Sequence, residues 1–358
     1  MKNNIELIKR LSLAFGPSGM EDEVRAIIED ELAPLKLKTR TDALGNLIVY
    51  PSVRNENAPT VMISAHMDEV GMMITHIEDN GVLRFAEIGG INTSVLAGRR
   101  VTVYGHDEKK INGVVATKAV HLQTPEERES PLTYDKLYID IGANSRSEAE
   151  ELVEIGDCGV FLSDFVVFGE DDSLIKCKAL DDRLGCAILI EILRRIEADK
   201  PTLNCNPVFC FTTREETGIS GAHVAANTVC PDYAIILETT TVADIAGAEE
   251  KNHVAHIGHG GVLSLLDRGS IYDKGFFQYA LSFKDEVKVQ IKEYVSGGND
   301  TRHIQISRDG CHAIALSAPT RYLHSSSCVL DVRDADEMET LVYKMLCNFQ
   351  LEKGNKNA

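Results

Sequence analysis

The sequence predicts an α/β fold in which a mixed sheet is flanked by helices and a small β-barrel is inserted. Apolar runs of buried-strand type, such as Val61–Ala65 and Tyr233–Leu237, predict the sheet, and apolar positions at helical spacing, as in Leu184–Leu193, predict the helices. The barrel is predicted because residues 71–164 form short alternating runs separated by Gly, Asn and Asp. A chain of 358 residues is long enough for a large domain with a smaller one.

The domain boundaries follow from this change of pattern. We assign residues 1–70 and 165–358 to the α/β domain and residues 71–164 to the inserted barrel. A short helix is expected at Ser147–Val153, and the rest of the insertion is expected to be all β. Its expected strands include Val82–Phe85, Arg100–Tyr104, Gly113–Thr117 and Leu137–Ile141.

The two ends of the chain carry further helical and extended patterns. A helix is expected at Asn4–Phe15, and the turn formers Gly16-Pro-Ser-Gly19 separate it from a second helix. Leu35–Thr41 and Asn46–Tyr50 are expected strands, and Asp334–Phe349 is the expected final helix. Residues 354–358 are expected to be a disordered tail.

Composition and charge exclude several classes of function. Hydrophobic residues make up 44% of the chain and charged residues 26%, and no apolar run approaches the ~18 residues of a membrane span. With no signal peptide evident, we expect a cytoplasmic protein. The net charge of −18 argues against nucleic acid or an anionic membrane as partner and suits a site that collects cations. The nine cysteines contain no Cys-x-x-Cys pair, so reduced and mostly buried thiols are expected.

Asp181 is the first candidate functional residue. It lies in Ala179-Leu-Asp-Asp-Arg-Leu-Gly185, between an expected strand, Leu174–Ala179, and an expected helix. Open α/β sheets place ligands at the carboxyl ends of their strands, and the first amides of a helix favour a negative group. Asp181 is therefore a candidate to bridge two metal ions. The alternative is that it serves only as the N-cap of the helix.

A histidine and an aspartate follow the strand Val61–Ala65. His66 and Asp68 are two residues apart, so they can face the same way as the extended chain leaves the sheet. Asp68 can then accept a hydrogen bond from one ring nitrogen of His66 while the other nitrogen holds a metal. A histidine at a strand end that is merely structural is the alternative.

Three later strands end on residues of the same kinds. Pro207–Thr213 is followed by Glu215 and Glu216, which repel each other unless cations neutralise them, although a solvated acidic turn is the alternative. Tyr233–Leu237 is followed by Glu238. His312–Ser317 is followed, after a short segment, by His324.

Together these residues predict a dinuclear metal site. Two histidines and four carboxylates at the ends of strands can ligate two divalent ions with five side chains and keep one as a base, as two-metal hydrolysis requires. Nitrogen and oxygen ligands without thiolate fit Zn²⁺, Co²⁺ or Mn²⁺. The six side chains are His66, Asp181, Glu215, Glu216, Glu238 and His324.

Five motifs spread along the chain resemble those of the M42 metalloaminopeptidase family, which contains glutamyl aminopeptidase and the tetrahedral (TET) peptidases. They are Gly-Pro-Ser-Gly at 16, Ala-His-Met-Asp-Glu-Val-Gly at 65, Ala-Leu-Asp-Asp-Arg at 179, Arg-Glu-Glu-Thr-Gly at 214 and Thr-Arg-Tyr-Leu-His-Ser at 320. The resemblance implies a zinc-peptidase-like sheet whose inserted domain is a PDZ-like β-barrel that takes part in subunit contacts. It also implies dimers that assemble into dodecamers.

The resemblance assigns roles to the candidate residues. It implies that Asp181 bridges two divalent ions, Zn²⁺ or Co²⁺ before Mn²⁺. It implies that His66 and Glu238 complete one metal site, that Glu216 and His324 complete the other, and that Glu215 is the general base. Many relatives have Asp at the position of Glu238. The glutamate keeps a carboxylate there but lengthens it, so a different metal affinity or preference is expected.

The implied activity is release of N-terminal amino acids from short peptides with free N-termini. A deacetylase or other amidase on the same scaffold, a glucanase, and an inactive accessory relative are the alternatives. A glycosidase uses two carboxyl groups flanking a sugar and needs no dinuclear metal, which argues against the glucanase. Arg302 is a candidate to select an acidic side chain, with an ordinary surface arginine as the alternative.

Overall fold

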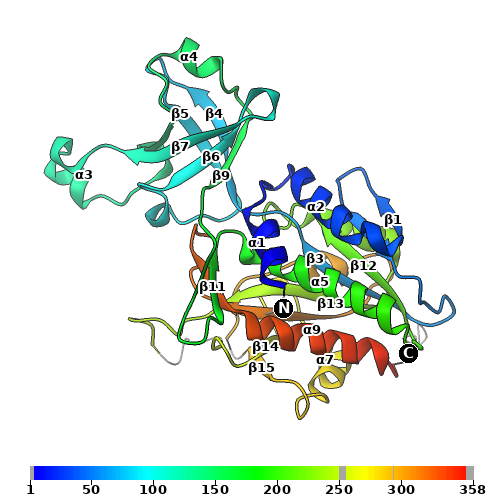
Figure 1. The fold of residues 1–358 in the computed structure, drawn as a ribbon. Helices are drawn as coiled ribbons and strands as arrows, with labels where there is room; N and C mark the ends of the chain where they lie inside the picture. The colour runs from blue at the N-terminus through cyan, green and yellow to red at the C-terminus, as the bar shows by residue number, and fades with distance from the viewer. Residues whose placement is uncertain (1–3, 250–254, 293, 352–358) are drawn as a thin grey trace.

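The protein has a three-layer α/β unit and a separate β-barrel that projects from it (Figure 1). The structure is a computed structural model that describes residues 4–249, 255–292 and 294–351. The expected disordered tail, residues 354–358, lies outside the described residues. No helix in the described part of the chain is long and apolar enough to cross a membrane.

The α/β unit is organised around an eight-stranded mixed sheet, with strand order β1-β2-β12-β3-β13-β16-β14-β15. Its strands are β1 (Lys38–Thr41), β2 (Leu47–Tyr50), β3 (Thr60–His66), β12 (Asn206–Thr212), β13 (Tyr233–Thr241), β14 (Gly261–Ser264), β15 (Val289–Lys292) and β16 (His312–Thr320). The central strands are fully buried, apart from their ends, which is why they appear in the sequence as continuous apolar runs.

Four neighbouring central strands, β12, β3, β13 and β16, run parallel. Their carboxyl ends therefore meet at one edge of the sheet. Thr212 pairs with His66, and Glu238 pairs with Ser317, at this edge. Residues from distant parts of the chain are thereby brought to the same level.

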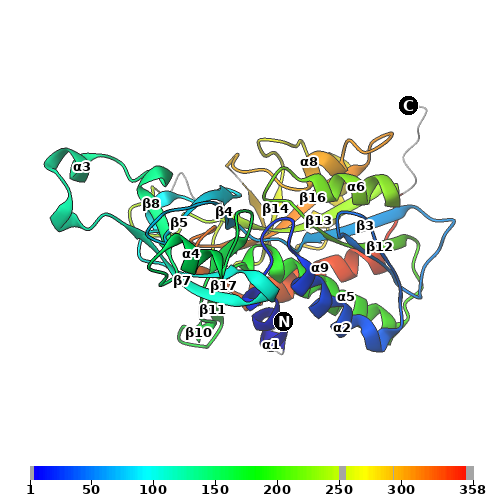
Figure 2. The ribbon, with the colours of Figure 1, turned by 90° about the horizontal axis from the view of Figure 1, so that it is seen from above.

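Helices cover both faces of the sheet (Figure 2). Helices α1, α2, α5, α7 and α9 pack with the strands into the larger core, whereas α6 and α8 cover the opposite face. The bounds are α1 (Ile5–Leu13), α2 (Asp22–Leu32), α5 (Leu180–Asp199), α6 (Ser220–Val229), α7 (Lys274–Leu281), α8 (Thr301–Ile304) and α9 (Val332–Cys347). Helix α5 is buried along most of its length, as its dense apolar pattern predicts.

The inserted barrel is closed, with strand order β4-β5-β8-β7-β6-β9, and has an apolar core of its own. Phe15 of the α/β unit stacks on Tyr104 of the barrel with ring centroids 4.3 Å apart, so an aromatic contact docks the two parts. The elements are β4 (Gly71–Ile77), β5 (Leu83–Ile88), β6 (Arg100–Tyr104), β7 (Lys110–Thr117), β8 (Leu137–Asp140), β9 (Cys158–Phe161), α3 (Pro125–Glu129) and α4 (Arg146–Glu150).

Several expectations about single elements are wrong. The start of the expected strand Leu35–Thr41 is a 3-10 turn followed by Lys36 in a left-handed conformation (φ 52°), because Pro34 favours a turn after α2. The expected strand at Leu174–Ala179 forms, as β11 (Leu174–Cys177), but outside the central sheet. It pairs with β10 (Val166–Phe168) and β17 (Cys328–Asp331) in a three-stranded antiparallel sheet. The helix α3 was not expected in the insertion.

Candidate metal centre

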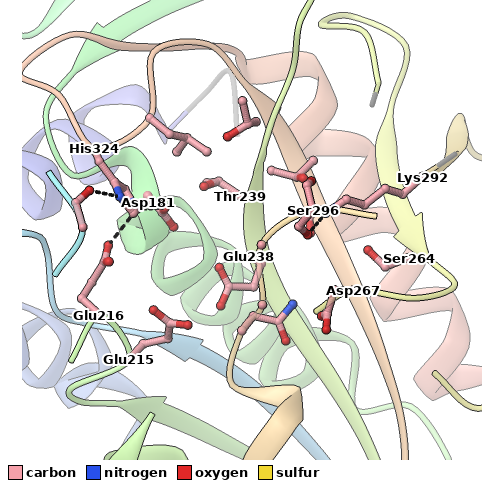
Figure 3. A pocket seen from close by; sticks show the side chains of 18 of the residues that line it. Asp181, Glu215, Glu216, Glu238, Thr239, Ser264, Asp267, Lys292, Ser296 and His324 are labelled. Carbon is pink, nitrogen blue, oxygen red and sulfur yellow. Dashed lines mark hydrogen bonds and ion pairs between the residues drawn. The ribbon is translucent and has the colours of Figure 1, made fainter. Parts of the chain in front are cut away.

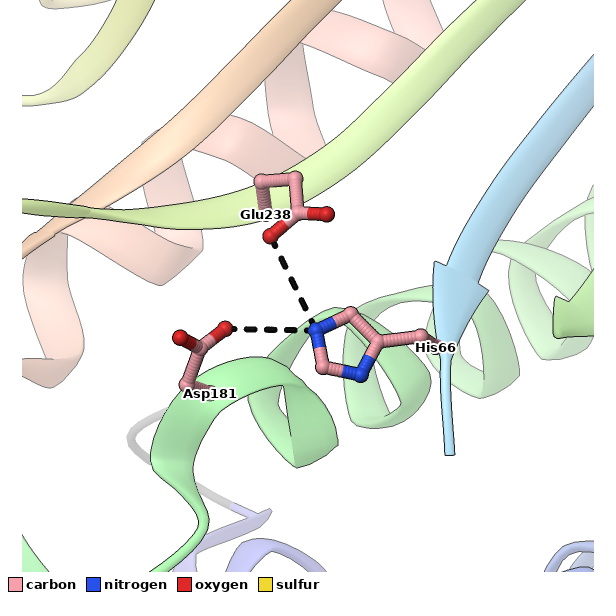
Figure 4. Close-up of side chains that lie close together, drawn as sticks. All are labelled: His66, Asp181 and Glu238. Carbon is pink, nitrogen blue, oxygen red and sulfur yellow. Dashed lines mark ion pairs between the residues drawn. The ribbon is translucent and has the colours of Figure 1, made fainter. Parts of the chain in front are cut away.

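All six predicted side chains converge at the carboxyl edge of the parallel strands (Figures 3 and 4). They come from five places in the chain: the end of β3, the start of α5, the turn after β12, which carries two of them, the interior of β13 and the loop after β16. Glu238 was expected after its strand, yet β13 continues to Thr241 because it pairs with β16 over its whole length. The carboxylate of Glu238 still faces the site, where Oε2 lies 3.8 Å from Nε2 of His66.

Asp181 lies between the two histidines. One carboxylate oxygen, Oδ1, lies 3.4 Å from Nε2 of His66, and the other, Oδ2, lies 3.5 Å from Nε2 of His324. A single carboxylate thus faces two separate nitrogen donors. Figure 4 shows Asp181 and Glu238 both directed at the ring of His66.

Two clusters share Asp181. We call His66, Asp181 and Glu238 the His66 cluster, in which Glu238 Oε2 lies 3.8 Å from His66 Nε2. Asp181, Glu216 and His324 are the His324 cluster, in which Glu216 Oε1 lies 3.3 Å from His324 Nε2. Glu215 and Glu216 also come together with His66 in a third group of potential ligands.

The spacing and the donor types fit metal ions. Ligands of tetrahedral zinc stand about 2.0–2.1 Å from the ion and hence roughly 3.3 Å from each other, close to the nitrogen–oxygen separations in both clusters. Asp181 Oδ1 and Glu238 Oε1 are buried and have no hydrogen-bond partner among the described residues. Buried carboxylate oxygens without a partner are costly, and a cation would supply the missing interaction.

Asp182, rather than Asp181, caps helix α5. Oδ1 of Asp182 accepts a hydrogen bond from the backbone N–H of Gly185 at 3.0 Å. Asp181 makes no such bond, and its backbone is not helical (φ −83°, ψ 111°). The capping role that sequence reasoning kept open for Asp181 therefore belongs to its neighbour, which leaves the carboxylate of Asp181 directed at the two histidines.

Backbone carbonyls orient both histidine rings. Nδ1 of His66 lies 3.1 Å from the carbonyl oxygen of Asp68, and Nδ1 of His324 lies 2.7 Å from that of Gly90 in the barrel. When Nδ1 carries the proton and donates a hydrogen bond to a carbonyl, Nε2 has a free lone pair that can bind a metal. Both Nε2 atoms are the ones that face Asp181.

The carboxylate of Asp68 lies beside His66, as predicted, and it also holds a turn of the chain. It lies 3.4 Å from Nδ1 of His66, farther than the Asp68 carbonyl. Its oxygens accept hydrogen bonds from Ser18 Oγ at 2.5 Å and from the backbone N–H groups of Glu215 and Glu216 at 3.0 and 3.1 Å. Asp68 therefore holds the turn that presents the two glutamates. Ser18 was missed as a site residue, although it lies in a motif that sequence analysis had noted.

A buried network of charged side chains lies next to the site. Glu69 Oε1 accepts hydrogen bonds from Lys178 Nζ at 2.6 Å and from Arg183 Nη2 at 3.3 Å. Arg183 also donates to the carbonyls of Leu11 and Gly16, so the network ties α1 to the start of α5. Sequence reasoning did not assign these residues, although Glu69 follows Asp68 directly and the other two lie close to Asp181 in the chain.

Electrostatics of the site favour protons or cations between the carboxylates. Burial raises the pKa of Glu216 to about 7, with Asp181 adding to the increase and His324 opposing it. Burial and the neighbouring charge of Glu216 raise the pKa of Glu215 well above its usual range. Burial favours the neutral ring of His324, but its contacts with Asp181 and Glu216 outweigh this and raise its pKa to about 10.

A family model described as M42 glutamyl aminopeptidase matches residues 45–341, most of the chain. The chain belongs to the M42 peptidase family. M42 proteins are metal-dependent peptidases, and the chain is accordingly an aminopeptidase-type hydrolase that acts on peptides.

Curated M42 relatives match the chain over nearly its whole length. FrvX of Escherichia coli (strain K12) is 34% identical over 98% of this chain and 97% of its own. A lysyl aminopeptidase of Pyrococcus furiosus is 30% identical, covering 95% of this chain and 96% of its own. A glutamyl aminopeptidase of Lactococcus lactis subsp. cremoris is 27% identical, covering 97% and 96%.

Solved M42 structures have the same fold. A TET aminopeptidase from a marine-sediment thaumarchaeon superposes with a TM-score of 0.94 at 31% identity, covering 98% of this chain and 97% of its own. The Pyrococcus horikoshii TET1 peptidase, which assembles into a tetrahedron or a large octahedral shell, has a TM-score of 0.84 at 32% identity, covering 96% and 99%. The PhTET1-12s form, a dodecamer, has a TM-score of 0.85 at 31% identity, covering 97% and 99%.

The clusters open into a cavity of about 670 Å³. Asp181, Glu215, Glu216, Glu238 and His324 line one part of it, and strands β14 and β15 with their following loops line another. Arg302 is exposed and does not line the cavity. The suggestion that Arg302 selects a side chain is therefore not supported.

Proposed function

We propose that this M42 protein is a dinuclear metal-dependent aminopeptidase that releases N-terminal amino acids from short peptides. The observation that carries the proposal is the position of Asp181, whose two oxygens face the histidines of two different clusters. In this proposal the carboxylate of Asp181 would hold both of two divalent ions, Zn²⁺ or Co²⁺ before Mn²⁺. His66 and Glu238 would complete one site, and Glu216 and His324 would complete the other.

Glu215 is the proposed general base. Glu216 is directed at His324, at 3.3 Å, which suits a ligand, whereas Glu215 lines the cavity beside that pair. Two bound ions would supply Lewis-acid polarisation of the scissile carbonyl and a lower pKa for a nearby water. Glu215 takes the proton of the attacking water and returns it to the leaving amine. Asp68 fixes the position of Glu215 through the backbone of the turn.

The free amino group of the substrate is the proposed anchor. The part of the cavity beside the clusters is lined by carboxylates, which attract an ammonium group. An amine held there places the first peptide carbonyl over the cluster, so cleavage is restricted to the first residue.

Two alternatives fit the site less well. A glucanase would need two carboxyl groups on either side of a sugar, whereas these carboxylates converge on two histidines. An inactive accessory protein would not need the complete set of ligands and base that is present here. An amidase or deacetylase on the same scaffold shares the metal chemistry and is separated by its substrate.

Assembly and location belong to the same proposal. We infer that residues 71–164 carry contacts between subunits of a dodecamer built from dimers, which is supported by the assemblies of the TET relatives. A cytoplasmic location is supported by nine cysteines that form no disulfide.

The decisive experiment compares free and acetylated substrates. Protein loaded with Co²⁺ or Zn²⁺ should hydrolyse aminoacyl-p-nitroanilides and release amino acids one at a time from the N-terminus of short peptides. N-acetylated versions should be nearly inert, and chelation should abolish the activity. Equal cleavage of acetylated peptides would contradict the aminopeptidase proposal and favour an amidase.

A further inference from the structure

The cavity extends beyond the carboxylates of the metal centre to a second wall made by β14, β15 and the loops that follow them. Figure 3 shows Ser264, Asp267, Lys292 and Ser296 on the far side of Glu238 from His324. This wall carries two charged groups of opposite sign, Asp267 and Lys292. Which of the two is available to a ligand decides what the wall recognises.

Asp267 is already satisfied by the protein. Its oxygens accept hydrogen bonds from the backbone N–H groups of Gly269 and Ser270 at 2.7 and 2.6 Å and from the hydroxyl of Tyr272 at 2.5 Å. Tyr272 is itself held by the side-chain amide of Asn299 at 3.0 Å. With three of about four acceptor positions used and 5% of the residue exposed, Asp267 serves to brace the loop.

Lys292 is not satisfied in this way. Its ammonium donates one hydrogen bond, to the carbonyl oxygen of Ser296 at 3.0 Å, out of three that an ammonium can donate. No carboxylate in the described part of the chain lies within ion-pair distance of it. Burial lowers the pKa of Lys292, an effect that Asp267 and Glu238 oppose from farther away. A partly buried ammonium without a counter-ion is the group that gains most from an anionic ligand.

The position of Lys292 suits the first side chain of a peptide. An amino group bound among the carboxylates and a carbonyl placed over the clusters leave the side chain of the first residue to extend along the cavity. Among the described residues that line this cavity, Lys292 is the one lysine, and there is no arginine. The relatives named above include both a glutamyl and a lysyl aminopeptidase. Sequence similarity alone therefore does not indicate whether this chain prefers an acidic or a basic first residue.

We propose that Lys292 is a specificity-determining residue that pairs with the side-chain carboxylate of an N-terminal glutamate or aspartate. This inference rests on the proposed aminopeptidase function. A hydrogen-bonded charge pair with this partly buried ammonium is expected to favour Glu over the isosteric Gln by about 10- to 100-fold in kcat/KM.

The test compares four proteins on five substrates. The wild type, Lys292→Met, Lys292→Arg and the control Lys284→Met, an exposed lysine on the surface, are loaded with Co²⁺ and assayed on Glu-, Asp-, Gln-, Leu- and Lys-p-nitroanilide. Lys292→Met should lose about 10- to 100-fold in kcat/KM on Glu and Asp and change less than about threefold on Gln and Leu. Lys292→Arg should keep most of the acidic preference, and Lys284→Met should behave as the wild type.

The possible failures are distinguishable. A wild type that cleaves Leu or Lys substrates better than Glu and Asp, or a Lys292→Met variant that loses all substrates equally with unchanged metal content and thermal stability, would overturn the assignment of Lys292 alone. A metal-loaded wild type that cleaves no substrate with a free amino group would overturn the proposed function instead. Lys292→Glu adds an independent arm, because reversing the charge should shift preference towards Lys-p-nitroanilide.

Discussion

The two clusters that share Asp181 are built from different parts of the molecule. In the His66 cluster the histidine side chain is 1% exposed, ends a central strand and is oriented by a carbonyl two residues away. In the His324 cluster the histidine side chain is 34% exposed, lies on a loop and is oriented by Gly90 of the barrel. The α/β unit alone thus positions the first cluster, whereas the second also depends on how the barrel is docked.

Asp181 tests whether the clusters share one carboxylate. Asp181→Ala removes an oxygen from each cluster at once, so both ions should be lost and kcat/KM should fall by at least about 10⁴-fold. Metal analysis of the purified variant and a p-nitroanilide assay measure these effects. A variant that retains two ions would show that the clusters do not depend on Asp181.

Adjacent glutamates give a matched pair of variants. Glu215→Gln should keep both ions and lose about 10²- to 10⁴-fold in kcat, because only the proton acceptor is removed. Glu216→Gln should lose the ion of the His324 cluster. Metal content beside kcat separates the two, and an empty Glu215→Gln with a fully loaded Glu216→Gln would reverse the assignment.

Loosening the barrel should affect the clusters unequally. Tyr104→Ala removes the stacking contact with Phe15. The affinity of the His324 cluster for its ion should fall by about tenfold, because groups that orient a metal ligand typically contribute this much. The affinity of the His66 cluster should change little. Titration of metal-free protein with Co²⁺ in a two-site analysis measures both. Tyr138→Ala, within the barrel strand β8, is the control. An equal loss of affinity at both sites would contradict the proposed dependence of the His324 cluster alone on the barrel.

Metal-free protein should become less stable as the pH rises. Glu216 has a pKa raised from 4.5 to about 7 and His324 from 6.5 to about 10 in the folded chain. A raised pKa stabilises the fold below the unfolded-state value, and this contribution is lost as the pH rises through the folded-state value. Bound ions replace these protons, so the increase in Tm on adding Zn²⁺ should be larger at pH 8 than at pH 6. An increase that shrinks with pH would contradict this linkage.

Much of the site was predictable because its residues stand beside strong local patterns. His66 ends one buried parallel strand and Glu216 follows another. The apolar runs of both strands are visible in the sequence, and parallel strands bring their carboxyl ends together. Asp181 was predicted for a partly wrong reason, since β11 belongs to the small sheet and the start of α5 places the residue. Periodicity reports that a segment is buried, but it does not report which sheet the segment joins.

By itself the sequence determined the α/β class, the inserted barrel and the six side chains of the cluster, because each depends on local periodicity or residue type. Only the tertiary structure decided that Asp182 caps α5 while Asp181 faces the histidines, and which groups bond to Asp68. It also decided that Lys292, and not Arg302, lines the cavity. These depend on hydrogen bonds and on cavity walls made by residues far apart in the chain. The sequence gives the chemical type of each side chain, but folding determines which hydrogen-bond and ion-pair partners that side chain has.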